Sequence, residues 1–206
     1  MIGGLTAFKL LSKPENADLE NLLKINTTLT MDAAQQESFN DVKSKLELDI
    51  TDYSALLNLA KLKQELLDYD AAETLYKGLN VRNSKDILVL NNLASLYYDI
   101  KKNPEAEKAN MDILAVSPKW INAYTNLYEI YQFYLKNDRA KLEPVLLRGI
   151  EEYPEMKKDL IMMTATYYDE LMGNNEKAIE YYGKVLETDP TNAGAKARIA
   201  ELKKIK

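Results

Sequence analysis

The chain has 206 residues, of which 46% are hydrophobic and 29% charged, and its formal net charge is −5. These proportions are ordinary for a soluble folded protein, and the mild acidity disfavours nucleic-acid binding. The chain has no Cys and no His, which excludes disulfides, Cys/His zinc sites, cysteine nucleophiles and histidine bases, and we expect no metal or cofactor. Seven Gly and six Pro allow few tight turns, so an all-α fold is favoured.

The N-terminal segment, residues 1–16, begins with the mostly apolar stretch "MIGGLTAFKLL". A membrane-spanning helix needs about 20 apolar residues, and the segment lacks the cleavage pattern of a signal peptide. Two interpretations remain open. The segment is either a packed or frayed N-terminal helix, or the trailing end of a membrane anchor, since its apolar stretch meets a Lys-bearing polar sequence. The location is therefore either cytoplasmic or membrane-tethered.

The rest of the chain is organised by an internal repeat. Pro118, Pro154 and Pro190 each follow an amphipathic run, and the two intervals between them are equal. Slightly shorter, equal steps back from Pro118 reach Ser84 and Ile50. A proline after an amphipathic run marks the end of a helix. We therefore expect units at about 17–50, 51–84, 85–118, 119–154 and 155–190, followed by a segment over 191–206.

Each unit contains small and large apolar residues at recurring positions, among them Leu59-Ala60, Leu93-Ala94, Ala72, Ala106 and Ala178. These positions resemble the tetratricopeptide repeat (TPR) pattern W-x2-L-G-x2-Y, A-x3-F and P. The resemblance covers about residues 17–206 and is strongest from 53 to 190. It implies an all-α, right-handed solenoid of about five antiparallel helix pairs, in which the small residues let two helices approach closely.

Two units depart from the pattern. In the first, Leu22, Ile25 and Leu29 fit the first helix, but Ser38 replaces the usual alanine. The fourth unit is slightly longer than the two before it, so we expect a longer turn near Asn137–Asp138.

The last segment, "NAGAKARIAELKKIK", is expected to be a capping helix. A terminal repeat needs a polar outer face. Ile199 and Leu202 would face the core, and Arg198 would face solvent together with Lys196, Lys203 and Lys204.

Adjacent carboxylates at Glu151–Glu152 and Asp169–Glu170 are the strongest catalytic candidates. Neighbouring residues on a helix point in different directions, so neither pair is expected to converge on one cleft. We interpret both as solvated surface, and we expect no enzymatic function and no catalytic residue.

Asn58, Asn92 and Asn126 form a series with equal intervals, one asparagine in each of three successive units. The TPR resemblance implies that this asparagine faces the concave groove and grips the backbone of an extended peptide, because an amide can bind either an N–H or a C=O group. In the alternative interpretation, the asparagines bond the neighbouring helix and fix its packing. Both interpretations remain open.

Further groove-facing candidates come from the same helix faces: Lys61, Asn91, Ser95, Tyr98, Asn122, Glu129 and Met163. The expected function is a non-catalytic protein–protein interaction scaffold that holds a peptide or partner segment in the groove. The alternative is a membrane-tethered assembly factor that uses the solenoid to dock other subunits. The sequence does not fix the partner or the oligomeric state.

Overall fold

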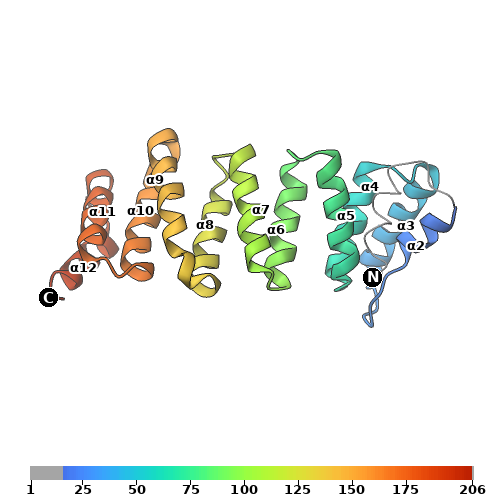
Figure 1. Ribbon diagram of the computed structural model, residues 1–206, viewed down its shortest axis with the longest axis horizontal. Helices are drawn as coiled ribbons and strands as arrows, with labels where there is room; N and C mark the ends of the chain where they lie inside the picture. The colour runs from blue at the N-terminus through green and yellow to red at the C-terminus, as the bar shows by residue number, and fades with distance from the viewer. Residues whose placement is uncertain (1–15, 206) are drawn as a thin grey trace. The chain divides into compact units, whose positions relative to one another are not determined.

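The computed structural model describes residues 16–205, and every regular element in this range is a helix (Figure 1). The N-terminal apolar segment therefore lies, except for Asn16, outside the described residues, and both interpretations of it stay untested. Within residues 16–205, no helix is long and apolar enough to cross a membrane.

The helices follow one another as pairs. The first helices of the pairs are α2 (Asn16–Leu23), α4 (Tyr53–Glu65), α6 (Ile87–Asp99), α8 (Ile121–Glu129) and α10 (Lys157–Thr166). The second helices are α3 (Ala33–Leu48), α5 (Tyr69–Arg82), α7 (Asn103–Val116), α9 (Leu142–Glu152) and α11 (Asn175–Thr188), and α12 (Ala193–Leu202) is the last. The prediction of an all-α fold of helix pairs with a C-terminal helix is confirmed.

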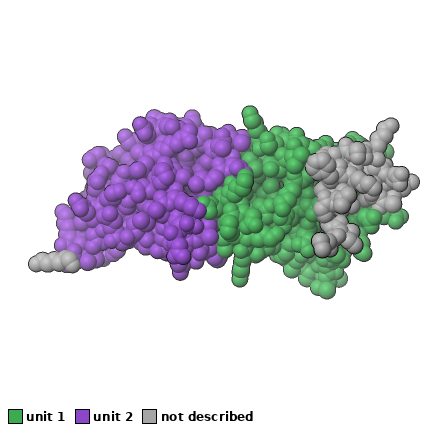
Figure 2. All heavy atoms as spheres, in the orientation of Figure 1, with its two compact units in different colours: residues 1–109 green, residues 110–206 purple. Residues whose placement is uncertain are grey.

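The chain divides into two compact units, residues 1–109 and 110–206, which are described separately (Figure 2). In the first unit, the alanines of the repeat pattern lie at the helix crossings. Ala60 and Ala72 are fully buried and Ala94 is 2% exposed. Leu59 and Tyr76 are also fully buried beside them. Because a small side chain lets two helices approach closely, these positions fix the spacing of the pairs.

Helix ends in the first unit recur at the interval of the repeat. Asp52 and Asp86 are N-caps, and their carboxylates accept hydrogen bonds from the Ala55 N–H (2.8 Å) and the Leu88 N–H (2.9 Å). At the opposite ends of α4 and α6, Leu67 and Lys101 have φ angles of 62° and 58°. A left-handed residue reverses the chain after a helix, so the turns between paired helices are alike.

The first pair differs from the expectation. α2 ends at Leu23, so the prediction that Ile25 and Leu29 lie on the first helix is wrong, and Leu29 is 47% exposed in an irregular segment. Residues 26–30 are "NTTLT", which have low helix propensity, and the Thr27 Oγ1 accepts a hydrogen bond from the Leu29 N–H at 3.0 Å. Asp32 then starts α3 with a capping box.

In the second unit, the first helices of two pairs end in π-helical turns, η1 (Ile130–Tyr134) and η4 (Tyr167–Leu171). A π turn inserts an extra residue into a helix, which fits the longer intervals of this region. A 3-10 helix, η2 (Lys136–Lys141), follows η1, so the prediction of a longer turn near Asn137–Asp138 is confirmed. A second 3-10 turn, η3 (Pro154–Met156), precedes α10.

Arg139 holds the two π turns together. Its guanidinium donates to the carbonyl oxygens of Tyr131, Gln132 and Leu171, each at 3.1 Å. Carbonyl groups at helix ends have no partner within their own helix, and a charged donor satisfies them well. Arg139 thereby stabilises both helix ends.

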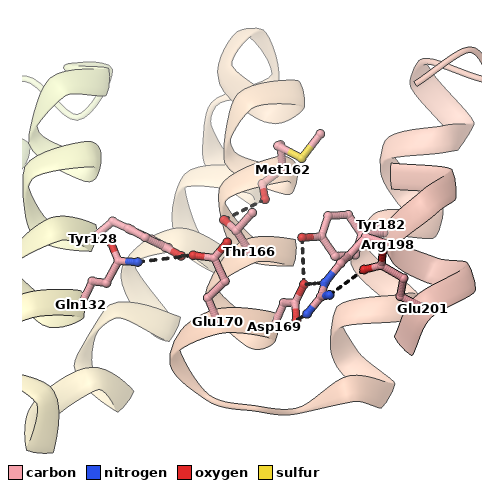
Figure 3. A network of polar contacts seen from close by, with 9 residues as sticks. All are labelled: Tyr128, Gln132, Met162, Thr166, Asp169, Glu170, Tyr182, Arg198 and Glu201. Carbon is pink, nitrogen blue, oxygen red and sulfur yellow. Dashed lines mark hydrogen bonds and ion pairs between the residues drawn. The ribbon is translucent and has the colours of Figure 1, made fainter. Parts of the chain in front are cut away.

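The capping helix α12 is fastened by an ion pair that the sequence did not reveal (Figure 3). Arg198 donates two hydrogen bonds to the Asp169 carboxylate, at 2.6 and 2.7 Å, and the Tyr182 hydroxyl donates a third at 3.1 Å. The Asp169 side chain is only 3% exposed. The prediction that Asp169 is solvated is therefore wrong, whereas the Arg198 side chain is 40% exposed and also binds Asp169.

We expect Asp169→Asn to lower the free energy of unfolding by about 2–3 kcal/mol at pH 7, because charged hydrogen bonds are lost. The hydrogen bonds from Arg198 hold the pKa of the Asp169 carboxyl below its ordinary value. A lowered pKa in the folded state stabilises the protein above the ordinary pKa, and this stabilisation is lost as the pH falls through the folded-state pKa. The difference between wild type and variant should therefore shrink below about pH 4.

Urea unfolding at a series of pH values measures this difference. The control is Glu187→Gln, which changes an exposed carboxylate on α11 and should alter stability by less than about 0.5 kcal/mol. A difference between wild type and Asp169→Asn that stays constant down to about pH 2 would contradict the role of the ion pair.

Candidate functional site

An open groove of about 200 Å³ lies between α3 and α4 in the first unit. It contains two of the residues that the sequence singled out, Asn58 and Lys61. Its lining consists of Ala34, Gln35, Ser38, Asn58, Lys61, Leu62 and Glu65. The groove therefore combines small apolar side chains with amide, hydroxyl and charged groups.

The rim of the groove carries one charge of each sign. Lys61 and Glu65 lie one turn apart on α4, and both are exposed. The ion pairs found within the described residues include neither of them. Both charged groups are therefore accessible to a ligand.

The three asparagines of the repeated series lie in different surroundings. Asn58 is exposed and lines the groove, whereas Asn92 is half-buried. Asn126 is half-buried, and its Nδ2 donates to the Asn110 Oδ1 at 3.0 Å. Asn110 is 1% exposed and occupies the repeat position that Tyr76 has one unit earlier. The packing interpretation is thus supported at Asn126, and the groove interpretation is best supported at Asn58.

Asn91, Ser95 and Tyr98 lie on one face of α6, because residues spaced by four and three positions are neighbours on a helix. Ser95 is exposed, and the other two are half-buried. α6 is in contact with α4, which carries Asn58 and Lys61. A role in binding stays a prediction for all three.

The C-terminal ends of α4 and α6 are tied together by side chains. The Gln64 Nε2 donates to the Asp99 carboxylate at 3.0 Å, and the Tyr76 hydroxyl donates to the Gln64 Oε1 at 3.1 Å. The amide of Gln64 thus joins α4 to both α5 and α6.

The remaining candidates belong to the second unit. Asn122 is exposed on α8, whereas Glu129 is half-buried. Met163 is half-buried and packs against the core of this unit, so part of its side chain already has an apolar contact. These residues belong to a different unit from Asn58 and Lys61. Their role in binding stays a prediction.

Figure 3 shows how the first helices of the second unit are joined. The Tyr128 hydroxyl and the Gln132 Nε2 both donate to the Glu170 carboxylate, at 3.1 and 3.4 Å. Glu170 is exposed, as predicted, but it is hydrogen-bonded rather than only solvated. Its carboxylate therefore has a structural role between α8 and η4.

Sequence reasoning missed a buried ion pair near the groove. The Lys63 ammonium lies 3.2 Å from the Asp68 carboxylate, and their side chains are 2% and 8% exposed. Lys63 also donates to the Lys24 carbonyl oxygen at 2.5 Å, and burial lowers its pKa. Lys63 occupies the repeat position that Tyr97 has one unit later. A lysine at a position where the next unit has a buried tyrosine was the signal in the sequence that could have revealed this ion pair.

Two buried tyrosines are paired with carboxylates. The Tyr97 and Tyr168 hydroxyls lie within hydrogen-bond distance of Glu73 and Glu143, and burial raises the pKa of both tyrosines to about 12. No cluster of acidic residues that could hold a metal ion occurs between residues 16 and 205.

The contacts predict different outcomes for two asparagine substitutions. Asn126→Ala removes a donor from the buried Asn110, so it should lower the free energy of unfolding by about 1–3 kcal/mol. Asn58→Ala changes an exposed side chain and should alter stability by less than about 0.5 kcal/mol. Urea unfolding of both variants measures the difference. Equal stability of the two variants would show that the Asn126–Asn110 hydrogen bond contributes nothing.

No protein-family model and no curated protein sequence matches the chain. Solved structures do match it. The crystal structure of MamA is 19% identical, covers 80% of this chain and 99% of its own, and has a TM-score of 0.56. A tetratricopeptide repeat protein from Parabacteroides merdae ATCC 43184 is 18% identical and has a TM-score of 0.58. The match covers 97% of this chain and 73% of that protein's chain.

A third match is the crystal structure of YrrB, described as a TPR protein with an unusual peptide-binding site. It is 16% identical, covers 78% of this chain and 81% of its own, and has a TM-score of 0.54. These identities are low, but the helix pairs agree over most of each chain. The chain therefore has the fold of tetratricopeptide repeat proteins.

Proposed function

We propose that the protein is a non-catalytic interaction scaffold that binds a peptide or partner segment at the surface formed by α4, α6 and the groove beside α3. The observation that carries this proposal is the open groove lined by Asn58 and Lys61. Both side chains are exposed, so they can bind a ligand without breaking contacts within the fold.

The chemistry of the groove suits a polypeptide. The Asn58 amide can donate to a backbone carbonyl group or accept from a backbone N–H group. Leu62 and Ala34 supply apolar contacts, and Lys61 and Glu65 offer charges to side chains of the ligand. A groove with these groups recognises a backbone together with a few side chains.

The fold supports the same function. YrrB is described as having a peptide-binding site, and it shares the arrangement of helix pairs. This support is an analogy between folds, so the proposal depends on the residues of this groove.

Selection from phage libraries of linear 12-residue and 18-residue peptides, with the full chain as bait, tests the proposal. Selected peptides are synthesised, and their Kd is measured by fluorescence anisotropy. Asn58→Ala and Lys61→Ala should each weaken binding about tenfold, which corresponds to one lost hydrogen bond or ion contact.

The matched controls are Asn40→Ala and Lys43→Ala, which change exposed residues on α3 outside the groove lining. They should leave the Kd unchanged. If no peptide is selected, or if the selected peptides bind the groove variants as tightly as wild type, the proposed function is wrong.

A further inference from the structure

The groove between α3 and α4 is open where the corresponding region of the next pair is closed. One unit later, Ala72 takes the place of Ser38 and Asn92 takes the place of Asn58. Ser38 and Asn58 are exposed, whereas Ala72 is fully buried and Asn92 is half-buried. Among the residues that the structure describes, no element covers these positions of the repeat in the first pair.

The covering element in the next pair is the C-terminal half of α4. There Gln64 bonds to Asp99 on α6 and to Tyr76 on α5. The corresponding part of the first pair is residues 24–31, which follow the end of α2 at Leu23. α2 has 8 residues and α4 has 13, so the first pair lacks the second half of its first helix.

Residues 24–31 make hydrogen bonds with Lys63 and Asp68, neither of which lines the groove. The Lys24 carbonyl oxygen accepts from the buried Lys63 ammonium at 2.5 Å. The Asn26 N–H donates to the Asp68 carboxylate at 2.9 Å. None of the residues 24–31 lines the groove, whose described lining comes only from α3 and α4. The chain therefore does not close the groove with this segment.

We infer that the groove takes an amphipathic α-helix of a partner protein, which occupies the place of the missing half-helix. This inference rests on the proposed function and specifies the conformation of its ligand. The missing part spans about two turns, since residues 24–31 would extend α2 by about 12 Å as a helix. A helix on a partner covers the exposed small side chains as α4 does in the next pair.

The groove also defines the side chains of this helix. Its apolar face would contact Ala34 and Leu62. Because Gln64 donates to Asp99 in the next pair, a donor such as Lys or Gln is expected against Glu65, which is the residue equivalent to Asp99. An acidic residue one turn away would match Lys61. The partner helix thus carries a donor opposite Glu65 and an acidic residue opposite Lys61.

The test uses a library of 18-residue amphipathic peptides displayed on phage, because shorter helices are marginal in water. Selected peptides should gain helical circular dichroism when they bind the full chain. A central proline should weaken binding about 100-fold, because it breaks the helix. Ser38→Trp should block the groove and weaken binding at least tenfold, whereas Ser44→Trp, an exposed site on α3 outside the lining, should not.

Peptides that depend on Asn58 and Lys61 but gain no helicity and tolerate proline would overturn the helix inference while the proposed function stands. Displacement of the selected helix by a synthetic peptide of residues 1–15 would assign the groove to the chain's own N-terminal segment instead. A dimer that dissociates when the peptide is added, seen by sedimentation, would assign it to a second copy. Either result would overturn the partner assignment.

Discussion

The structure depends on one constraint: a single helix pair cannot bury its apolar face, so each pair must be covered by the next. Small residues at the crossings, such as Ala60, Ala72 and Ala94, allow the close approach that this covering requires. Wherever a covering element is missing, the chain exposes positions that are buried elsewhere. In the second unit, α12 packs against α11 and covers the last helix pair. The Arg198–Asp169 ion pair holds α12 in place. At the first pair it leaves a groove.

The parts of the fold that depend on the repeat could be predicted from the sequence, because the regular interval places each alanine and each helix end. The parts that depend on individual partners could not. Asn126 looks the same as Asn58 in the sequence, but only Asn126 bonds to another asparagine, Asn110, at the position that Tyr76 has one unit earlier. Asp169 and Lys63 are charged residues that become buried because a specific opposite charge reaches them. Such pairs depend on individual side chains that do not recur from unit to unit, so they leave no periodic signal.

The site was predicted in part. Asn58 and Lys61 line the groove, but the early end of α2 was not predicted, because Ile25 and Leu29 continue the apolar pattern. Spacing alone indicated a helix there, whereas the local preference of Thr and Asn residues and the capping box at Asp32 decided otherwise. A departure from the repeat, rather than the repeat itself, therefore creates the candidate binding site.

Replacement of residues 24–31 with a copy of residues 58–65 tests this account most directly, because it supplies the missing half-helix within the chain and leaves every residue of the groove lining unchanged. The account predicts that helical circular dichroism increases, that the free energy of unfolding rises, and that groove-binding peptides lose their affinity. A chain that gains the helix and still binds these peptides with the wild-type Kd would contradict the claim that the missing half-helix creates the site.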